Sequence, residues 1–504
     1  MRNACLRIFI SVVGSALLCS IGLGETRLFA DTLQEQNPAA TPVGDQANRA
    51  IYHISVISYS PPKFDVSADV PVDGDMLDMD RTYPADLPEM KAGGWSTVIS
   101  DLTVTDPQGK SADIKPLGNK GWQLSHAVNS RLHLHYVVDL SIFAKSGWSS
   151  ALESAFADDS VAIVVGRSLF ITTNKILDAR VEFAALEGRI PIVPWTQDKN
   201  THRFSVRTKD ELTNDMLAFS KVRPDIVTAG GFKMQIVSMG HWQPLRPQIN
   251  SALRTIVSRE VGLMHFTEKE TYTVILLPIR DEGGNAFRQS FVYCYEDPNQ
   301  NNVGTWANTL AHEIFHYWNY GRLKGLDYAS SQWFQEGFTE YVANLVTVQG
   351  KIIDANAFLG KLSEHANNYR KLTTSLENYG THKGPPLYSA GALVAFMWDV
   401  NIRKASDGKR NIGDLLRNLM VQTESGTQKY TWTDIEAALQ TTAPGDWEDF
   451  YQRFIKGKQP LPLKEILPIA GLRLNKLADG SEQVTLDRTA PTKAKTLWRG
   501  LIAN

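Results

Sequence analysis

Two histidines four residues apart, with a glutamate beside the first, are the residues of this sequence best suited to chemistry. His312, Glu313 and His316 form an H-E-x-x-H sequence inside an apolar 3.6-residue pattern that predicts a helix over 304–320. Residues four apart share one face of a helix, so both imidazoles can bind one Zn²⁺ ion. Glu313 falls on a neighbouring face, where its carboxylate can reach a water molecule at the metal. The alternative is a helix with two histidines on a polar or core face.

A catalytic zinc ion also needs a third protein ligand and an open position. Ser330 and Ser331 can cap a second helix, predicted over 331–348, and Glu336 on this helix is the candidate ligand. An antiparallel arrangement of the two helices places Glu336 opposite the histidines. Glu340 follows one turn later on the same face and can accept the free ring N–H of a ligand histidine. A solvated surface carboxylate is the alternative for Glu340.

The composition excludes several classes of protein. The chain has 504 residues, of which 43% are hydrophobic and 10% aromatic, which indicates a globular, multidomain protein and excludes a disordered polymer. The 52 Lys and Arg residues nearly balance the 54 Asp and Glu residues, giving a net charge of −2, so we expect no nucleic-acid partner. Only three cysteines occur, and two of them, Cys5 and Cys19, lie in the first 30 residues, so a disulfide framework is not expected.

The first 30 residues are typical of a secretory signal. Arg2 and Arg7 precede an apolar run from Ile8 to Leu23, which is short for a bilayer span of roughly 20 residues. We therefore expect a signal over 1–30 and an exported protein, periplasmic or extracellular, rather than an uncleaved anchor. No later segment is long and apolar enough to cross a membrane, so we expect no integral membrane segment after signal removal.

The rest of the chain predicts an α+β multidomain protein. Residues 31–48 form a polar leader, and residues 49–215 consist of short alternating runs that indicate an N-terminal antiparallel β domain. His133 and His135 share one face of such a run, and a solvent-facing position is preferred over a metal site. Longer 3.6-residue patterns follow, with a strand over Tyr272–Ile279. The remaining predicted segments are a catalytic domain over 216–350, a helical domain over 351–472 and a tail over 473–504.

Two segments resemble a known family. The sequences HEIFHYWN over 312–319 and WFQEGFTEY over 333–341 are similar to the two signature helices of the gluzincin metallopeptidases, most closely the glycyl aminopeptidase family. The resemblance covers most of residues 50–472 and implies an N-terminal β domain, a thermolysin-like catalytic domain and a C-terminal helical domain. It also implies one zinc ion per chain. Members of the family often end in a PDZ domain. We expect the tail after Leu472 to be too short for such a domain.

The same resemblance assigns roles to individual residues. It implies His312, His316 and Glu336 as zinc ligands and Glu313 as the catalytic carboxylate. Gluzincins of the aminopeptidase type also use the tyrosine of a Tyr-x-Lys-Gly pattern to donate a hydrogen bond to the oxyanion. Tyr388 matches this position, although alanine replaces the lysine. The alternatives are a tyrosine that packs at a helix start and, as the donor, His382.

A glycine-rich segment matches the strand that binds substrate in related aminopeptidases. Gly283 and Gly284 are retained, but no glutamate follows them to bind a free amine, and Glu282 on the other side is a possible substitute. A plain turn is the alternative for the glycine pair. The strand Tyr272–Ile279 is expected at the sheet edge, where it can pair with an extended substrate.

These patterns predict an exported zinc peptidase that acts on a peptide or protein. Exopeptidase and endopeptidase action both stay open, as does the oligomeric state. The alternatives are a zinc-containing peptide-binding protein with little turnover and a hydrolase of another bond, such as an ester.

Overall fold

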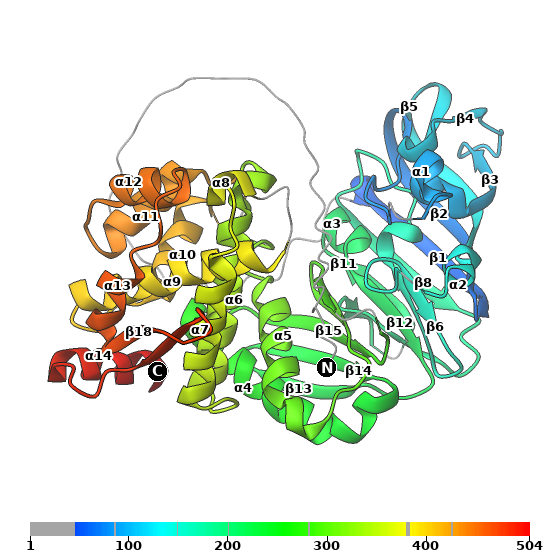
Figure 1. Cartoon of the computed structure of the whole chain (residues 1–504). Coiled ribbons are helices and arrows are strands. Elements are labelled where there is room, and N and C mark those ends of the chain that lie inside the picture. The colour runs from blue at the N-terminus through cyan, green and yellow to red at the C-terminus, as the bar shows by residue number, and fades with distance from the viewer. Residues whose placement is uncertain are drawn as a thin grey trace, which may run out of the picture. The chain divides into compact units, whose positions relative to one another are not determined.

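The computed structural model describes residues 46–84, 87–148, 150–199, 201–280, 283–379, 384–424 and 427–503. The predicted signal, Glu282 and His382 lie outside these residues. The described chain divides into two compact units, residues 46–191 with 195–214 and residues 192–194 with 215–503 (Figure 1). None of the helices in the described part is long and apolar enough to cross a bilayer.

The first unit is built on a large β-sheet. Its strand order is β10-β11-β8-β1-β2-β5-β3, with β4 paired to β5, and every pairing except β1 with β8 is antiparallel. The strands are β1 (Arg49–Tyr59), β2 (Pro62–Leu77), β3 (Ile99–Thr105), β4 (Ile114–Pro116), β5 (Trp122–Asp139), β8 (Asp178–Ala184), β10 (Thr196–Gln197) and β11 (Arg203–Val206). The predicted N-terminal β region is therefore confirmed.

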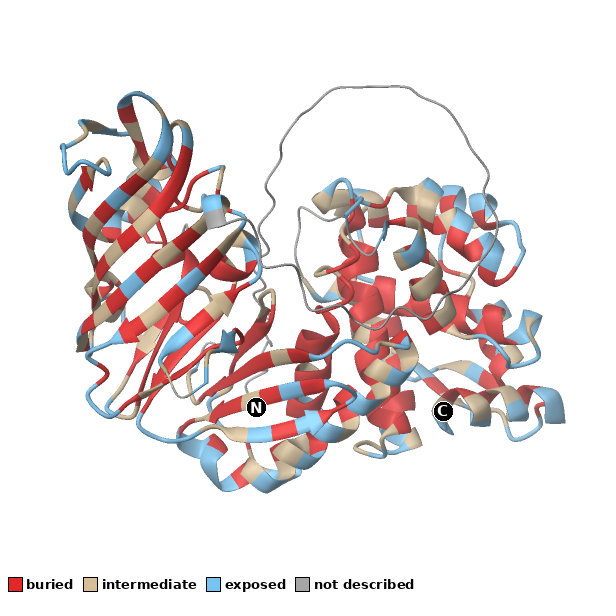
Figure 2. Ribbon diagram, turned by 180° about the vertical axis from the view of Figure 1, so that it is seen from behind, coloured by how far each residue is buried: buried red, intermediate tan, exposed pale blue. Residues whose placement is uncertain are grey.

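Alternation of side chains explains why this sheet forms. Along β1 and β2, buried residues alternate with more exposed ones, as the stripes in Figure 2 show. Tyr52, Phe64 and Tyr136 are buried on the inner face. His133 and His135 lie on the other face, where they contact Asp69 at 3.3 Å and Asp65 at 3.1 Å. The two histidines are thus half-exposed partners of surface carboxylates, as the preferred interpretation of the sequence expected.

Shorter elements complete the first unit and lead into the second. They are α1 (Met90–Gly93), α2 (Ser141–Lys145), β6 (Ala155–Ala157), β7 (Val161–Val165), β9 (Ile190–Ile192), α3 (Lys209–Thr213) and β12 (Met216–Ser220).

A five-stranded sheet begins the second unit. It comprises β13 (Asp225–Ala229), β14 (Phe232–Ser238), β15 (Glu270–Leu277), β16 (Gly283–Ala286) and β17 (Ser290–Cys294), in the order β13-β14-β15-β17-β16. The predicted edge position of Tyr272–Ile279 is wrong, because β15 pairs on both sides with parallel neighbours. Its nearly continuous burial is typical of a central strand. The strands at the two edges of the sheet are β13 and β16, and β16 pairs antiparallel with β17.

Helices form most of the second unit. They are α4 (Arg246–Met264), α5 (Val303–Phe315), α6 (Tyr328–Gln349), α7 (Ala355–Tyr369), α8 (Leu376–Tyr379), α9 (Pro385–Ala405), α10 (Ile412–Gln422), α11 (Trp432–Thr442), α12 (Trp447–Phe450), α13 (Leu463–Ile466) and α14 (Thr492–Ala503). One apolar core, which includes Trp306, Phe334 and Trp398, joins these helices to the sheet. The predicted α+β class with a helical C-terminal region is confirmed.

Two details of the helices differ from the sequence-based expectation. Helix α6 begins at Tyr328, and its cap is Asp327, whose side chain accepts the N–H of Ser330, so the predicted caps Ser330 and Ser331 lie inside the helix. The tail contains a hairpin of β18 (Leu472–Lys476) and β19 (Glu482–Leu486), followed by α14, which was not predicted.

Candidate metal centre

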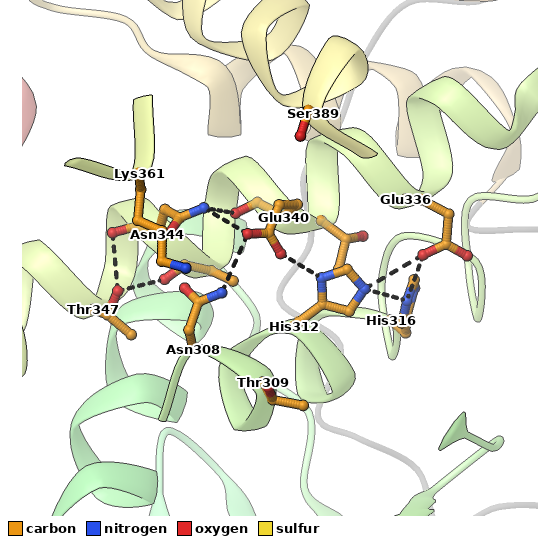
Figure 3. Close-up of polar contacts among 12 residues, drawn as sticks. Asn308, Thr309, His312, His316, Glu336, Glu340, Asn344, Thr347, Lys361 and Ser389 are labelled. Carbon is orange, nitrogen blue, oxygen red and sulfur yellow. Dashed lines mark hydrogen bonds and ion pairs between the residues drawn. The ribbon is translucent and has the colours of Figure 1, made fainter. Parts of the chain in front are cut away.

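The end of α5 and the middle of α6 carry the predicted ligands. His312 and Glu313 lie in the last turn of α5, His316 directly follows this helix, and Glu336 lies on α6. The chain between the two helices turns back, which brings Glu336 to the two histidines, as Figure 3 shows. All four residues are buried, with exposed fractions of at most 5%.

Three ligand atoms converge at this point. Nε2 of His312 and Nε2 of His316 are 3.1 Å apart, and each lies 3.4 Å from Oε2 of Glu336. Among the described residues, these three side chains form the one His, Cys, Asp and Glu group whose donor atoms all lie within 4.8 Å of one another. The structure therefore brings together the three residues that the sequence predicted as ligands.

The outer nitrogens of both imidazoles have acceptors, which determines what the inner nitrogens can do. Nδ1 of His312 donates to Oε2 of Glu340 at 3.1 Å, and Nδ1 of His316 donates to the carbonyl of Asn319 at 3.0 Å. With a ring proton held at each Nδ1, both Nε2 atoms point at the carboxylate of Glu336, and a metal ion bound there would take the place of a proton on Nε2. Two nitrogen ligand atoms and one oxygen ligand atom thus face each other. This donor set fits a Zn²⁺ ion, which takes imidazole and carboxylate ligands.

The electrostatics of the cluster reflect the same arrangement. Burial acts to lower the pKa of His312, but the carboxylates of Glu336 and Glu340 outweigh it and raise the pKa to about 10. Burial acts to raise the pKa of both glutamates, and the histidines outweigh it in turn. The pKa of Glu340 falls to about 2 and that of Glu336 falls well below its usual range. Glu340 is thus a buried anion, and the alternative of a solvated surface carboxylate is wrong.

Glu313 lies against the edge strand of the sheet. A Cβ atom added at Gly284 would stand 2.1 Å from Oε1 of Glu313, so only glycine permits this approach. The segment Gly283–Ala286 is the strand β16, and the alternative of a plain turn is wrong. Burial raises the pKa of Glu313 above its usual value, while His312 and His316 oppose this shift. A raised pKa favours proton transfer by this carboxylate near neutral pH.

Tyr388 lies in the first turn of α9 and faces the cluster. Its ring stacks on that of His312, with centroids 5.9 Å apart and an interplanar angle of 26°. Burial raises the pKa of Tyr388 well above its usual value, and the nearby Glu336 adds to this shift. The phenol therefore keeps its proton at neutral pH and can donate a hydrogen bond.

Sequence reasoning missed several buried polar residues around the centre. The amides of Asn308 and Asn344 donate to Oε1 of Glu340 at 3.3 and 2.9 Å. The amide of Asn319 donates to the carbonyls of Phe334 and Gln335, at 3.1 and 2.9 Å, just before the ligand Glu336. Asn308 stands four residues before His312 and Asn344 four residues after Glu340, so helical spacing was the available signal.

One buried acid that is under the electrostatic influence of His312 was also missed. Glu260 of α4 is fully buried, and neither of its carboxylate oxygens has a hydrogen-bond partner among the described residues. Burial raises the pKa of Glu260 well above its usual value, and His312 opposes this shift. Burial thus favours the neutral form of Glu260 over the charged form.

Comparison with known proteins identifies the centre. A family model described as M61 glycyl aminopeptidase matches residues 305–380, which include most of α5 and all of α6, α7 and α8. This chain is a zinc metallopeptidase. The match confirms the resemblance to the glycyl aminopeptidases that the two helix sequences predicted. No curated protein matches this metallopeptidase significantly by sequence.

Solved structures share the fold of this metallopeptidase. An aminopeptidase N family protein from Idiomarina loihiensis is 21% identical, with a TM-score of 0.68, and the match covers 85% of this chain and 79% of that one. An M1 zinc metallopeptidase from Deinococcus radiodurans, in a mutant form bound to a Tyr-Ser-Ala substrate, is 14% identical with a TM-score of 0.53. That match covers 82% of this chain and 95% of the other.

Proposed function

We propose that this metallopeptidase is exported and hydrolyses peptide bonds, with Glu313 as general base and Tyr388 as oxyanion donor. The observation that carries the proposal is the convergence of three ligand atoms, from His312, His316 and Glu336, beside the buried carboxylate of Glu313. When bound by these three residues, a zinc ion supplies a Lewis acid that polarises the peptide carbonyl and lowers the pKa of a water molecule.

Glu313 transfers the protons in this mechanism. Its carboxylate takes a proton from the attacking water and delivers it to the nitrogen of the leaving amine. Contact with Gly284 holds the carboxylate in place, and the raised pKa brings it closer to the pH at which the reaction runs. A positioned acid or base of this kind contributes about 10²–10⁴-fold to the rate.

Tyr388 stabilises the charge that develops on the carbonyl oxygen. Its protonated phenol can donate a hydrogen bond to that oxygen, and the stack on His312 holds the ring beside the centre. Removing one preorganised donor of this kind costs about 10²–10³-fold in kcat.

The edge strand β16 is the proposed binding strand for the substrate backbone. It ends the strand order of its sheet and carries Gly283 and Gly284, the second of which contacts Glu313. An extended peptide that adds to this edge would place its carbonyl groups next to the general base. No glutamate follows the glycine pair to bind a free amine, so internal cleavage is compatible with the site as well as end trimming.

Cleavage of a mixed peptide library tests this proposal. The purified chain is incubated with the peptides, with and without a zinc chelator, and the products are mapped by mass spectrometry. We expect cleavage that the chelator abolishes and that added zinc restores, and the positions of the cuts distinguish end trimming from internal cutting. Glu313→Gln is the matched control and should lose about 10²–10⁴-fold in turnover while it keeps zinc.

Two results would contradict the proposal. Turnover by Glu313→Gln at the wild-type rate would exclude Glu313 as the base. Stoichiometric zinc without cleavage of any peptide would instead favour a peptide-binding protein. Export is tested separately by fractionation of the source cells and N-terminal sequencing of the recovered protein, which should begin after the apolar run Ile8–Leu23.

A further inference from the structure

His365 connects two parts of the site that are far apart in the sequence. It lies on α7, is 6% exposed, and appears in none of the roles described above. Its Nε2 lies 3.3 Å from the amide nitrogen of Asn344 and 3.8 Å from Oε1 of Glu340. Its Nδ1 lies 3.2 Å from Oγ of Ser389, the residue that follows Tyr388 on α9.

Contacts on both sides of the ring favour one tautomer of His365. The amide nitrogen of Asn344, which also donates to the carbonyl and to Oε1 of Glu340, can only donate in its longer contact with Nε2 of His365, so Nε2 is the acceptor there. In this tautomer Nδ1 carries the ring proton and donates to Oγ of Ser389. Burial lowers the pKa of His365, although the Glu340 carboxylate acts to raise it. The lowered pKa favours the neutral imidazole. Both ring nitrogens of this residue therefore have a defined partner.

These contacts close a ring around the centre. The ring starts at His312, whose imidazole donates to Glu340, and continues through Asn344 to His365 on α7. It then crosses to Ser389 on α9 and returns through the stack of Tyr388 on His312. Its members, several of which are labelled in Figure 3, are His312, Glu340, Asn344, His365, Ser389 and Tyr388.

His365 links the start of α9 to α7. Gly384 occupies the cap position of α9 and has no side chain that could cap the helix. The contact of His365 with Ser389 attaches the residue after Tyr388 to α7. We propose that His365 is a positioning residue that holds Tyr388 beside His312, an inference that rests on the proposed role of Tyr388.

Kinetics in two backgrounds test this proposal. His365→Ala and Ser389→Ala are each made in the wild type and in Tyr388→Phe, and kcat, KM and zinc content are measured. In the wild type, loss of such a supporting contact should lower kcat about 10- to 100-fold with little change in KM. In the Tyr388→Phe background, the same change should alter kcat by no more than about twofold.

Conservative and control variants keep the test interpretable. His365→Asn retains an N–H donor near Nδ1 and should recover most of the lost kcat. Ser363→Ala also lies on α7, but its hydroxyl contacts Leu359 and Val484, so its kcat should equal that of the wild type. If His365→Ala fails to fold, Ser389→Ala tests the same bond from its other end.

A structural readout separates this inference from the proposed function. Crystal structures of the wild type and His365→Ala should show the 5.9 Å stack of Tyr388 on His312 only in the wild type. A stack that persists in the variant would overturn the inference, as would an equal loss of kcat in both backgrounds. A lost stack in a chain whose wild type shows no turnover would support the positioning role and reject only the proposed function.

Discussion

Gly284 of the edge strand and Glu313 of α5 approach so closely that a side chain on the glycine would overlap the carboxylate. The separation between an added Cβ and Oε1 of Glu313 would be 2.1 Å, which no pair of unbonded atoms tolerates. The glycine thus sets the distance between the strand proposed to bind substrate and the residue proposed to move its protons.

Substitution of this glycine should displace the general base. In Gly284→Ala the new methyl group pushes the carboxylate of Glu313 aside, and a misplacement of about 1 Å can cost about 10²-fold in rate. We expect kcat/KM to fall by at least this factor, with zinc content unchanged because no ligand moves. Gly360→Ala is the matched control, since an added Cβ there meets nothing within 4 Å. Wild-type kinetics in Gly284→Ala would show that Glu313 is not held by this contact.

Removal of one hydroxyl from Tyr388 should impair the chemical step alone. Tyr388→Phe keeps the ring that stacks on His312 and loses the donor, so kcat should fall about 10²–10³-fold while KM and zinc content stay close to the wild-type values. Tyr369→Phe loses a phenol that only accepts the N–H of Leu461 and serves as the control. A kcat for Tyr388→Phe within the error of the wild type would exclude the tyrosine as oxyanion donor.

Asn319 should affect both metal affinity and stability. Its amide donates to two carbonyls at the turn of α6 before Glu336, and its own carbonyl accepts from His316. Asn319→Ala removes both hydrogen bonds to carbonyls that keep other partners within α6, so each loss should cost about 0.5–1.5 kcal/mol in the free energy of unfolding. Loosened support of Glu336 should weaken zinc binding about 10- to 100-fold, as measured by competition with a chelator. Unchanged zinc affinity would show that the turn holds Glu336 without Asn319.

An ion pair between β13 and α4 should make stability depend on acid pH. Hydrogen bonds from Arg246 lower the pKa of Asp225 from its usual 3.8, against the effect of burial. The folded state therefore favours the charged form, so this pair stabilises the protein above pH 3.8 and the stabilisation is lost as the pH falls through the lowered pKa. The pair is partly exposed, so Asp225→Asn should cost only about 0–1 kcal/mol at pH 7.

Denaturant unfolding at several pH values measures this dependence. The stability difference between the wild type and Asp225→Asn should shrink towards zero as Asp225 becomes protonated. In an Arg246→Gln background the difference should be small at every pH. A difference that grows on acidification would contradict the sign derived from the lowered pKa.

Helical spacing explains which parts of the centre could be predicted. His312 with His316, and Glu336 with Glu340, are pairs four residues apart on single helices, so each pair shares a face in any structure that forms the helix. The residue types then restrict the chemistry to a metal site. The sequence also shows that only a short segment separates the two predicted helices, so their packing against each other could be expected.

The remaining contacts depend on tertiary packing. His365 and Ser389 meet because α7 packs against α9, and nothing in their local sequence indicates this. The edge strand was misassigned because β15 has the stronger apolar pattern, whereas β16 consists of two glycines, an asparagine and an alanine. Helix α14 was missed although Ala494, Trp498 and Leu501 follow a helical spacing on its buried face.

The zinc content of the purified chain and of its ligand variants is the most direct test of the central claim. Measured by mass spectrometry of the metal after dialysis, the wild type and Glu313→Gln should each contain one zinc ion per chain. His316→Ala and Glu336→Ala should contain almost none, because each loses one of three protein ligands. Full zinc content in either ligand variant would contradict the account.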